Sequence, residues 1–598
     1  MKDRKEVVTR ADVKKVFGKD NFFTDMLTRV VMRVLGINKI NRLYSKSAHL
    51  KGLDFADDML RVYNTTWNRS VDQLSVIPKE GPFVIVGNHP FGAIEGVLLY
   101  SAIGRIRPDF KLMANFLLTY LEPVKDAFIA VNPFQDNPEW GNSVGGIRAA
   151  LEHLKEGHGL AIFPAGEVSR YHGHDYPEDI EWSASIARLI QKTKVPVIPL
   201  YIDGKNSKRF YFLSKINSML STACLPHEMT NKRNMDILFR LGKPITASEL
   251  EPYSDPKELA AYLRSRAYAL EANVPFEKIA FRHCSAVEMD KQKDVAVMIK
   301  ELEAVRDTSL IFSCLNYDCY LLEHDSIPTL MHEIGRRREE AFRAIGEGSG
   351  KAIDIDQYDA YYKHLVLWDR EKKSLIGAYR LGYGSEIVPK YGLDGFYISS
   401  LFKMNDSLKE RASRSVELGR SFVSVEFQKD MMPLLLLLRG LLMVVVRNKD
   451  IQSFIGPVSI STWYPKFYQS LIVRYVSTMH NSDTLKNEFS PRTPFKEDFL
   501  KVDADVLLSK NMDSLEKFDR FMLKLSNGAY RMPTLFKRYL KLGAKFLCFN
   551  IDPDFNDTLD GLLFINFNEV PKSELEMLVK DSPDEERKVL LQRFGYDE

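Results

Sequence analysis

Short apolar runs alternate with amphipathic stretches along the first half of the chain. The runs at residues 83–87, 160–163 and 195–200 have the length and the branched apolar residues of buried strands. The stretches at residues 144–154 and 183–191 repeat apolar residues at helical spacing. Strands that alternate with helices predict an α/β domain built in layers.

A second α/β pattern begins near residue 310, after a charged helical stretch at residues 256–270 and a polar linker. Strands are predicted at residues 375–381 and 421–427, and the helix predicted at residues 328–345 has proline in its first turn. The chain is therefore expected to hold two α/β domains in succession.

The most apolar stretch, residues 431–446, contains a proline, an arginine and a glycine. It is shorter than the roughly 20 residues that a membrane-spanning helix needs, so it predicts a buried helix or a helix–strand pair. The N-terminus is charged and lacks the apolar run of a signal peptide, which predicts a protein that is not exported.

Composition narrows the class of protein. The 598 residues are 45% hydrophobic and 27% charged, as is typical of globular proteins. Basic and acidic residues nearly balance, at 83 against 80, and give no reason to expect a nucleic-acid partner. The five cysteines are too scattered for a disulfide or zinc framework and favour a reducing, cytosolic compartment.

Positive charge is concentrated at the N-terminus, where residues 1–51 hold 13 Lys or Arg against 5 Asp or Glu. Within this segment, residues 22–35 place apolar side chains at helical spacing, with Arg29 and Arg33 on one side. This pattern is typical of a helix that lies on anionic lipid. A surface helix packed on its own domain would show the same pattern, so the sequence leaves both interpretations open.

A first candidate site follows the strand at residues 83–87, which runs into Asn-His-Pro-Phe-Gly-Ala-Ile-Glu. His89 stands where the strand gives way to a helix, a position that substrate can reach. Glu95 is placed to bind one imidazole nitrogen, which leaves the other to take a proton from a hydroxyl group. A single histidine and glutamate at this spacing would also suit a structural histidine.

Two further motifs follow in order: Phe-Pro-Ala-Gly-Glu-Val-Ser-Arg at residues 163–170, and the apolar, proline-containing strand at residues 195–200. Together the three motifs resemble the lysophospholipid acyltransferase family, over roughly residues 75–275. The resemblance implies a glycerolipid-acyltransferase-type α/β domain that uses acyl thioesters. It also implies that His89 activates an acceptor hydroxyl, that Glu95 orients His89, and that the second motif binds the acceptor through Gly166, Glu167 and Arg170.

The sequence departs from that family at three positions. The acid is Glu95, which stands one residue later than the family's usual aspartate. This variant resembles the branch of the family that is often labelled hemolysin-like. Ala165 and Val168 stand where the family has glutamate and arginine, so the charges are displaced to Glu167 and Arg170. Because the arginine that would clamp a phosphate has moved, we expect an acceptor without phosphate, such as an acylated amino acid.

A second candidate site is a series of charged residues in the C-terminal half. Its members are Asp356, Asp359, Arg380, Glu417 and Arg420. Taken singly, each fits a solvated helix or strand face. As an ordered set, which extends over most of residues 300–570, they resemble hemolysin-like ornithine N-acyltransferases, which are similar to autoinducer synthases within the N-acetyltransferase-like (GNAT) fold. The resemblance implies an amine that attacks an acyl chain carried on acyl carrier protein.

Chemistry suggests a role for each residue type. An α-amine must lose a proton to attack a thioester, and Glu417 is the candidate general base. Asp356 and Asp359 would either hold a cationic amino acid or fix nearby arginines. Arg380 and Arg420 would bind a substrate carboxylate or brace the site.

Three further features of the sequence bear on these sites. Residues 343–348 read Arg-x-x-Gly-x-Gly, but they follow a helix rather than join a strand to a helix. Gly346, Gly348 and Gly350 are therefore expected to form a flexible loop, such as a lid, and acyl carrier protein is favoured over acyl-coenzyme A as donor. The arginines at residues 336–338 are candidates to receive the acidic carrier, although helix solvation explains them equally. The His172-Gly-His174 pair lacks further ligands, so neither a metal nor a cofactor is expected.

These observations predict a bifunctional acyltransferase. Residues 1–60 would form a basic, membrane-proximal segment, residues 61–290 an O-acyltransferase domain, and residues 291–598 a GNAT-like N-acyltransferase domain. The C-terminal domain would attach a 3-hydroxyacyl chain to an amino acid, ornithine or glycine, and the N-terminal domain would then acylate the new hydroxyl of the lyso-aminolipid.

Both acylation reactions would take place on the cytoplasmic side of a bacterial inner membrane. The protein would bind peripherally to the anionic surface of that membrane. Two alternatives remain. One is a phospholipid O-acyltransferase of the 1-acylglycerol-phosphate type with a degenerate second domain. The other is a non-enzymatic, hemolysin-like membrane-binding protein.

Overall fold

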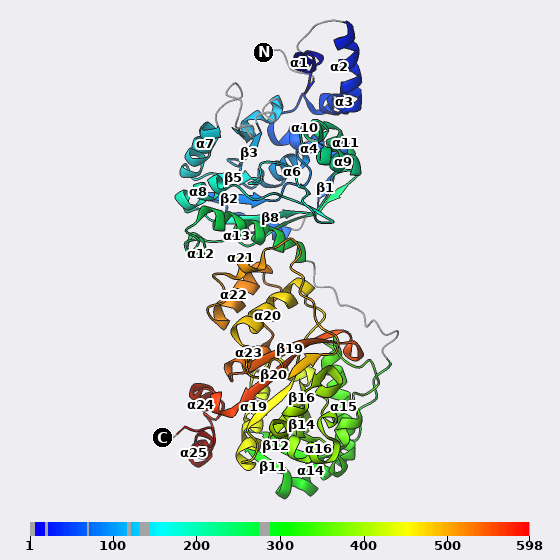
Figure 1. Cartoon of the computed structure of the whole chain (residues 1–598), viewed down its shortest axis with the longest axis vertical. Helices are drawn as coiled ribbons and strands as arrows, with labels where there is room; N and C mark the ends of the chain where they lie inside the picture. Colours follow the sequence, from blue (N-terminus) through cyan, green and yellow to red (C-terminus); the bar gives the residue numbers. More distant parts are fainter. Residues whose placement is uncertain are drawn as a thin grey trace. The chain divides into compact units, whose positions relative to one another are not determined.

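The computed structural model describes residues 6–17, 22–67, 71–115, 121–131, 143–216, 218–273 and 287–596 (Figure 1). The chain forms two compact units. The first comprises Met1–Val274 and Phe499–Ala529, and the second comprises Pro275–Asp498 and Tyr530–Glu598. The main division falls close to the predicted one, but residues 499–529 belong to the first unit rather than to the second.

The first unit is built on a six-stranded sheet of order β10-β8-β2-β5-β3-β4. All neighbouring strands are parallel except β10 and β8, which are antiparallel. The strands are β2 (Phe83–Gly87), β3 (Lys111–Asn115), β4 (Phe128–Val131), β5 (Gly159–Ile162), β8 (Val197–Ile202) and β10 (Phe239–Leu241). The three strands predicted from apolar runs are β2, β5 and β8, so their placement is confirmed.

Helices cover this sheet and account for the amphipathic stretches. They are α6 (Ile94–Ile103), α7 (Ser143–Lys155), α8 (Ala184–Thr193) and α13 (Pro256–Tyr268), with α9 (Lys208–Ile216), α10 (Ser218–Ala223) and α11 (Leu225–Asn231) after β8. The N-terminal helices are α1 (Arg10–Phe17), α2 (Phe22–Val34), α3 (Ile37–Ser47) and α4 (Gly52–Tyr63). Leu43, Tyr44 and Phe55 of α3 and α4 are buried in the same core as Phe83 of β2. The predicted boundary at residue 60 therefore lies inside the core of the first unit.

Residues 499–529 join the first unit through two short helices, α21 (Ala504–Leu508) and α22 (Leu515–Leu525), of which α21 contacts α13. The Arg266 guanidinium lies 5.6 Å from the Phe521 ring centroid. The Asn527 side chain donates to the Leu241 carbonyl oxygen at 2.9 Å. Nothing in the local sequence pattern marks this association, because it depends on partners more than 200 residues away.

The second unit is built on an eight-stranded sheet of order β11-β12-β13-β14-β16-β17-β20-β19. Its strands are β11 (Leu310–Cys314), β12 (Tyr317–Glu323), β13 (Lys363–Asp369), β14 (Ser374–Tyr383), β16 (Ser415–Val423), β17 (Ser453–Ile460), β19 (Lys545–Asp552) and β20 (Thr558–Asn566). Every neighbouring pair is antiparallel except β16 and β17. That parallel pair requires a crossover, which α19 (Met432–Arg447) supplies.

Helix α19 confirms the prediction for the most apolar stretch. Gly440 lies so close to β12 and β13 that an added Cβ would be 2.9 Å from Cys319 Sγ and 3.0 Å from Leu365. The other helices are α14 (Val295–Ser309), α15 (Pro328–Arg343), α16 (Gly384–Tyr391), α17 (Ile398–Leu401), α18 (Lys409–Ser413), α20 (Lys466–Met479), α23 (Thr534–Lys541), α24 (Lys572–Leu578) and α25 (Asp584–Arg593). Across the described ranges, none of the helices has the length and apolar character needed to cross a bilayer.

The predicted strand at residues 421–427 is wrong in its second half. Strand β16 ends at Val423, and Val425–Phe427 form a 3-10 turn. The Ser424 hydroxyl donates to the Leu375 carbonyl oxygen at 2.8 Å. A serine that binds backbone with its side chain competes with the strand ladder and ends it here.

Strands β16 and β17 pair over three residues only, Ser415–Glu417 against Ser453–Ile455. Directly after this stretch, Gly456 approaches the backbone of Leu418 so closely that an added Cβ would overlap the Leu418 carbonyl oxygen. Glycine is therefore required where the two strands begin to part.

We expect Gly456→Ala to destabilise the second unit by about 1–3 kcal/mol, because backbone rather than a side chain must move to make room. Differential scanning calorimetry measures the change. The matched control is Gly145→Ala in α7, where an added Cβ meets nothing within 4 Å and the helix should gain about 0.5–1 kcal/mol. A wild-type melting temperature for Gly456→Ala would contradict the required glycine.

Candidate active sites

Three neighbouring strands bring the N-terminal motifs to one edge of the first sheet. Strand β2 lies between β5 and β8 and is parallel to both, with Val86 opposite Ile162 of β5. The His89 motif follows β2, residues 163–170 follow β5, and the proline-containing motif forms β8. Because parallel strands end at the same edge of a sheet, His89 and residues 163–170 meet there.

His89 and Glu95 form an ion pair at the start of α6. His89 Nδ1 lies 3.0 Å from Glu95 Oε1, which also accepts the N–H groups of Phe91 at 2.9 Å and Gly92 at 2.8 Å. Burial acts to lower the pKa of His89, but the Glu95 carboxylate outweighs it and raises that pKa. Burial acts to raise the pKa of Glu95, and His89 outweighs it and lowers that pKa. With Nδ1 beside the carboxylate, Nε2 is the ring nitrogen left to take a proton.

Residues 163–170 pack directly on His89. The Phe163 ring stacks on the imidazole with the ring centroids 4.4 Å apart. The Ser169 N–H donates to the His89 carbonyl oxygen at 2.9 Å. Gly166 has a φ of 72° in the turn after β5, a conformation that favours glycine. The structure thus brings these two motifs together.

The displaced charges of this motif pair with each other. Arg170 Nη2 lies 3.4 Å from Glu167 Oε2, and the Arg170 side chain is mostly buried. Val168, at the position where the related family has arginine, is buried and packs under Gly92, whose added Cβ would be 3.3 Å from Val168 Cγ2. No guanidinium therefore occupies position 168.

Two buried charged residues near His89 belong to none of the predicted motifs. Asp179 is 2% exposed, and its Oδ1 accepts the His89 N–H at 3.2 Å. Lys232 is 3% exposed, and its Nζ lies 4.7 Å from the centroid of the Phe91 ring. In the sequence, both stand in polar stretches that are typical of surface, so no local signal marks them.

The second site lies on one face of the eight-stranded sheet. His364 on β13 is opposite Arg380 on β14, and Arg380 is opposite Gly419 on β16. Glu417, two residues before Gly419, points to the same face because side chains alternate along a strand. Arg380 and Glu417 are therefore diagonal neighbours on that face.

Glu417 is completely buried and accepts three hydrogen bonds. Its Oε2 accepts the Tyr362 hydroxyl at 2.7 Å and the Tyr397 N–H at 3.0 Å, and its Oε1 accepts the Ile398 N–H at 3.1 Å. Burial raises the pKa of Glu417 to about 7, and these hydrogen bonds offset only part of that rise. A carboxyl group of this pKa is suited to accept and release a proton near neutral pH.

The two predicted aspartates hold arginines. Asp359 binds Arg338 of α15 through both oxygens, at 3.1 and 2.9 Å, and also accepts the Asp356 N–H at 2.8 Å. Arg380 Nη1 lies 2.6 Å from Asp356 Oδ1. Burial acts to raise the pKa of Asp359, but Arg338 and Arg380 hold it well below its usual range. Of the two roles expected from the sequence, the contacts correspond to fixing the arginines.

Arg380 keeps one edge of its guanidinium unpaired. Three tyrosines surround it, Tyr358, Tyr362 and Tyr397, with the Arg380 Cζ 5.3–5.6 Å from their ring centroids. Within the described part of the chain, Nε and Nη2 are buried and have no hydrogen-bond partner. A buried guanidinium edge without a partner is suited to a carboxylate ligand.

Arg420 braces the site. It has a φ of 48° beside the register shift between β14 and β16. Its Nε lies 3.2 Å from Asp354 Oδ2, and its Nη1 donates to the Tyr397 hydroxyl at 3.2 Å. Its guanidinium also lies 4.6 Å from the Phe555 ring centroid. The Tyr397 ring thus lies near both guanidinium groups, 5.3 Å from Arg380 Cζ and 4.8 Å from Arg420 Cζ.

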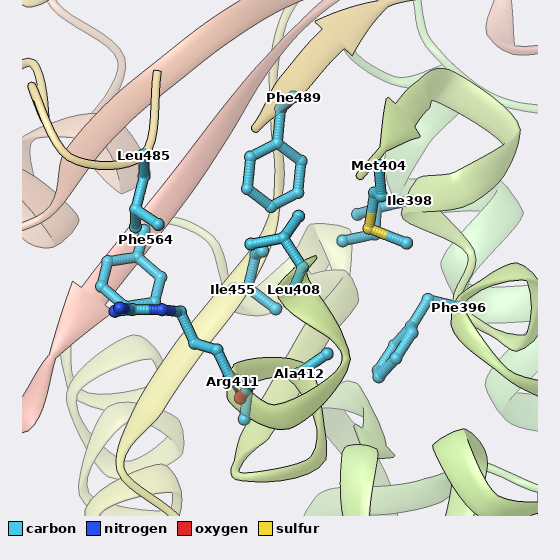
Figure 2. A pocket seen from close by; sticks show the side chains of 11 residues that line it. Phe396, Ile398, Met404, Leu408, Arg411, Ala412, Ile455, Leu485, Phe489 and Phe564 are labelled. Atoms are coloured by element: carbon cyan, nitrogen blue, oxygen red, sulfur yellow. Dashed lines mark hydrogen bonds between the residues drawn. The ribbon is translucent and has the colours of Figure 1, made fainter. Parts of the chain in front are cut away.

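An apolar pocket shares a wall with Glu417 (Figure 2). Its lining consists of Phe396, Ile398, Met404, Leu408, Arg411, Ala412, Ser415, Ile455, Leu485, Phe489 and Phe564. Ile398 donates its N–H to Glu417, and Ile455 lies opposite Glu417 on β17. Arg411 is the exposed and charged member of the lining, and its guanidinium lies 5.9 Å from the Phe564 ring centroid.

Three arginines of α15 do not form the open basic surface that the sequence suggested. Arg338 is buried on Asp359, while Arg336 and Arg337 both bind Glu333, with shortest distances of 2.6 and 2.9 Å. Arg337 also lies 2.6 Å from Glu426. All three arginines therefore form ion pairs with carboxylates of the second unit.

The glycine loop after α15 is not a free lid. The buried Glu339 carboxylate accepts the N–H groups of Ser349 at 3.1 Å and Gly350 at 2.8 Å. Gly346 packs against the Trp463 ring, which an added Cβ would overlap. The loop is therefore held at both ends.

No metal centre involves the His172-Gly-His174 pair among the described residues. His174 Nε2 instead lies 3.5 Å from Glu178. The one group of possible ligands that the described ranges contain is His153, Glu156 and His158, whose ligand atoms lie within 4.8 Å of one another. It precedes β5 and so lies at the opposite end of that strand from residues 163–170.

Family models match both halves of the chain. A model described as "Acyltransferase" matches residues 15–275, and one described as "Acetyltransferase (GNAT) domain" matches residues 337–438. The matches follow the order of the two units and confirm the predicted fold class, an acyltransferase-type α/β domain before a GNAT-like one.

Curated relatives include enzymes of two activities. A glycine N(alpha)-acyltransferase of Phocaeicola vulgatus is 30% identical over 48% of this chain and 94% of its own length. A protein of the same name in Bacteroides thetaiotaomicron is 28% identical over 45% of this chain and 84% of its own length. A lyso-glycine lipid O-acyltransferase of P. vulgatus is 25% identical over 39% of this chain and 83% of its own length. The chain therefore belongs to the family of bifunctional aminolipid acyltransferases, with an acyltransferase domain followed by a GNAT domain.

Proposed function

We propose that this acyltransferase makes a phosphorus-free glycine lipid in two steps. The GNAT-like unit joins a 3-hydroxyacyl chain to the amine of glycine, and the first unit acylates the hydroxyl that arrives with that chain. One observation carries the proposal: each unit holds a buried glutamate beside a group suited to its own acceptor. Glu417 is a diagonal neighbour of Arg380, whose guanidinium has an unpaired edge, and Glu95 lies beside His89. The names of the relatives favour glycine over ornithine.

In the first step, the glycine carboxylate binds Nε and Nη2 of Arg380, which places the amine toward Glu417. Glu417 takes a proton as the amine nitrogen attacks the thioester carbonyl carbon. The C–N bond forms, the C–S bond breaks, and the departing thiolate receives the proton. The apolar pocket beside Glu417 would take the acyl chain (Figure 2).

In the second step, His89 Nε2 takes the proton of the 3-hydroxyl as its oxygen attacks a second thioester. Glu95 stabilises the imidazolium through Nδ1, and the proton then passes to the leaving thiolate. The apolar Val168 supports an acceptor without phosphate, because it offers no guanidinium at the position where the related family has arginine. The order of the steps follows from supply, since the hydroxyl comes with the first chain.

Acyl carrier protein is the proposed donor in both steps, although acyl-coenzyme A shares the same thioester. The Arg-x-x-Gly-x-Gly pattern offers no cradle for the pyrophosphate of coenzyme A. The Glu339 carboxylate accepts the N–H of Gly350, two residues after the pattern, and its negative charge would repel a phosphate there.

Peripheral binding to the cytoplasmic face of the bacterial inner membrane completes the proposal. Helix α2 exposes Phe23, Met26, Leu27, Val30 and Val34, which recur at helical spacing along one face. Helix α9 exposes Phe212 and Ile216, and its Arg209 donates to the Val34 carbonyl oxygen, which links the two helices. Arg29 and Arg33 are exposed on α2, as suits an anionic bilayer.

The division of labour predicts different products from two variants. Cells that lack aminolipids and express His89→Ala should accumulate mono-acylglycine, while Glu417→Ala should yield neither lipid, each with its own step slowed about 10²- to 10⁴-fold. Mass spectrometry of extracted lipids shows which occurs. Identical profiles for the two variants would contradict the division. Efficient acylation of lysophosphatidic acid would favour the phospholipid alternative, and lysis without new lipid would favour the non-enzymatic one.

The pKa of Glu417 predicts the pH dependence of N-acylation. Because the base must be ionised, kcat should rise with pH through about 7 and then level off. Tyr362→Phe removes a hydrogen bond that stabilises the ionised carboxylate, so the rise should move about one unit higher. Rates measured across this range with a saturating donor test both points. An unmoved profile in Tyr362→Phe would contradict the role of Glu417 as base.

The exposed face of α2 predicts lipid binding. Phe23→Ser combined with Val30→Ser should weaken binding to vesicles that contain phosphatidylglycerol at least about tenfold, because two apolar side chains no longer enter the bilayer. Vesicle flotation at low and high salt measures it. Val297→Ser, an exposed valine of α14, is the matched control and should bind like wild type. Equal binding by all three proteins would contradict this surface.

A further inference from the structure

Asp179 is a buried carboxylate beside His89 that neither the motifs nor the reaction steps above use. It stands between β7 (Pro177–Glu178) and α8, and only 2% of the residue is exposed. A charge buried this deeply is costly unless its oxygens are fully paired, so its contacts bear on its role.

Every partner of the Asp179 carboxylate is a donor. Oδ1 accepts the His89 N–H at 3.2 Å and the Ser169 hydroxyl at 2.6 Å, and Oδ2 accepts the Trp182 indole N–H at 3.0 Å. Burial raises the pKa of Asp179, and these three contacts offset only part of that rise. The His89 and Trp182 N–H groups can only donate, so they favour the ionised carboxylate.

Asp179 and Ser169 hold the His89 backbone from two sides. Asp179 accepts the His89 N–H, while the Ser169 N–H donates to the His89 carbonyl oxygen at 2.9 Å. Because the Ser169 hydroxyl also binds Asp179, the three residues form a closed set of hydrogen bonds. This set fixes the strand-to-helix exit after β2 to the motif after β5.

Helix α13 holds Asp179 from behind. The Asp179 N–H donates to the Tyr268 hydroxyl at 2.8 Å, and Arg264 Nη2 donates to the Asp179 carbonyl oxygen at 2.9 Å. Arg264 Nη1 also donates to the Lys501 carbonyl oxygen at 3.2 Å. The brace thus extends to residues 499–529, which the first unit receives from far along the chain.

We propose that Asp179 is a positioning residue for O-acylation. It fixes the backbone of His89 against residues 163–170, and its negative charge stabilises the imidazolium that forms when His89 takes the hydroxyl proton. It touches neither substrate nor the reacting atoms. The proposal rests on the proposed function, since it deepens the second step.

The charged groups around His89 determine whether loss of the Asp179 charge raises or lowers the pKa of His89. Glu95 faces the ring from α6 and Asp179 faces it from the loop before α8, and both raise the pKa of His89 against the effect of burial. Lys232, directly after α11, acts on Glu95, and Arg264 of α13 binds the Asp179 backbone. Neutralising Asp179 therefore removes one of two negative charges and lowers the pKa of His89.

The test is the pH profile of O-acylation by the full-length protein, with a synthetic N-(3-hydroxyacyl)glycine as acceptor. His89 must be neutral to act as base, so activity falls below its pKa. We expect Asp179→Asn to lower kcat and to move this acid limb of kcat/KM about one pH unit lower. Asp175→Asn, an exposed aspartate just before β7, is the matched control and should leave both unchanged. An acid limb that stays in place in Asp179→Asn, with activity reduced equally at every pH, would overturn the proposal.

Ser169→Ala keeps the test decisive if Asp179→Asn fails to fold. This variant retains the charge but opens the set of hydrogen bonds, so kcat should fall several-fold while the acid limb stays in place. A wild-type kcat in Ser169→Ala would contradict the positioning role. Wild-type protein that transfers no acyl group to the acceptor would instead defeat the proposed function, and the two failures are thereby distinguished.

Discussion

Each unit of this protein is organised around a buried glutamate held by two successive backbone N–H groups. Phe91 and Gly92 donate to Glu95, and Tyr397 and Ile398 donate to Glu417. The backbone thus fixes the position of each carboxylate, while the side chain beside it fixes its chemistry. Next to His89, Glu95 has a lowered pKa and stays an anion that supports the imidazole. Burial raises the pKa of Glu417 to about 7 although the Tyr362 hydroxyl acts to lower it, so this carboxyl group is itself suited to exchange protons.

The two sheets supply these glutamates in different ways. In the first unit the carboxylate is on a helix that begins after a parallel strand, so the site lies at the edge where β2, β5 and β8 end. In the second unit it is on β16, on the face shared with Arg380 and beside the point where β16 and β17 part. Gly456 allows the close backbone contact with Leu418 at that point, and Ile455 beside it lines the apolar pocket. An acyl chain and a polar acceptor can therefore meet at one residue.

Much of this arrangement could be predicted from the sequence, because the motifs are local. Strands, helices and the residues of both sites follow from short patterns in a fixed order, and the structure brings His89 to Glu95 and Glu417 to Arg380. What escaped prediction depends on distant partners. The arginines of α15 look like a surface patch until Glu333 and Asp359 are seen to bind them, and nothing local assigns residues 499–529 to the first unit. Asp179 has no signal, since an acid in a polar loop is typical of surface.

The central claim is that one chain holds two separate active sites that act in sequence. The most direct measurement mixes purified His89→Ala and Glu417→Ala proteins with glycine and 3-hydroxyacyl and acyl donors. If the first variant releases mono-acylglycine and the second acylates it, the mixture makes the two-chain lipid that neither variant makes alone. A mixture that remains as inactive as its components, although each variant is folded and the wild type is active, would contradict two sites that work independently.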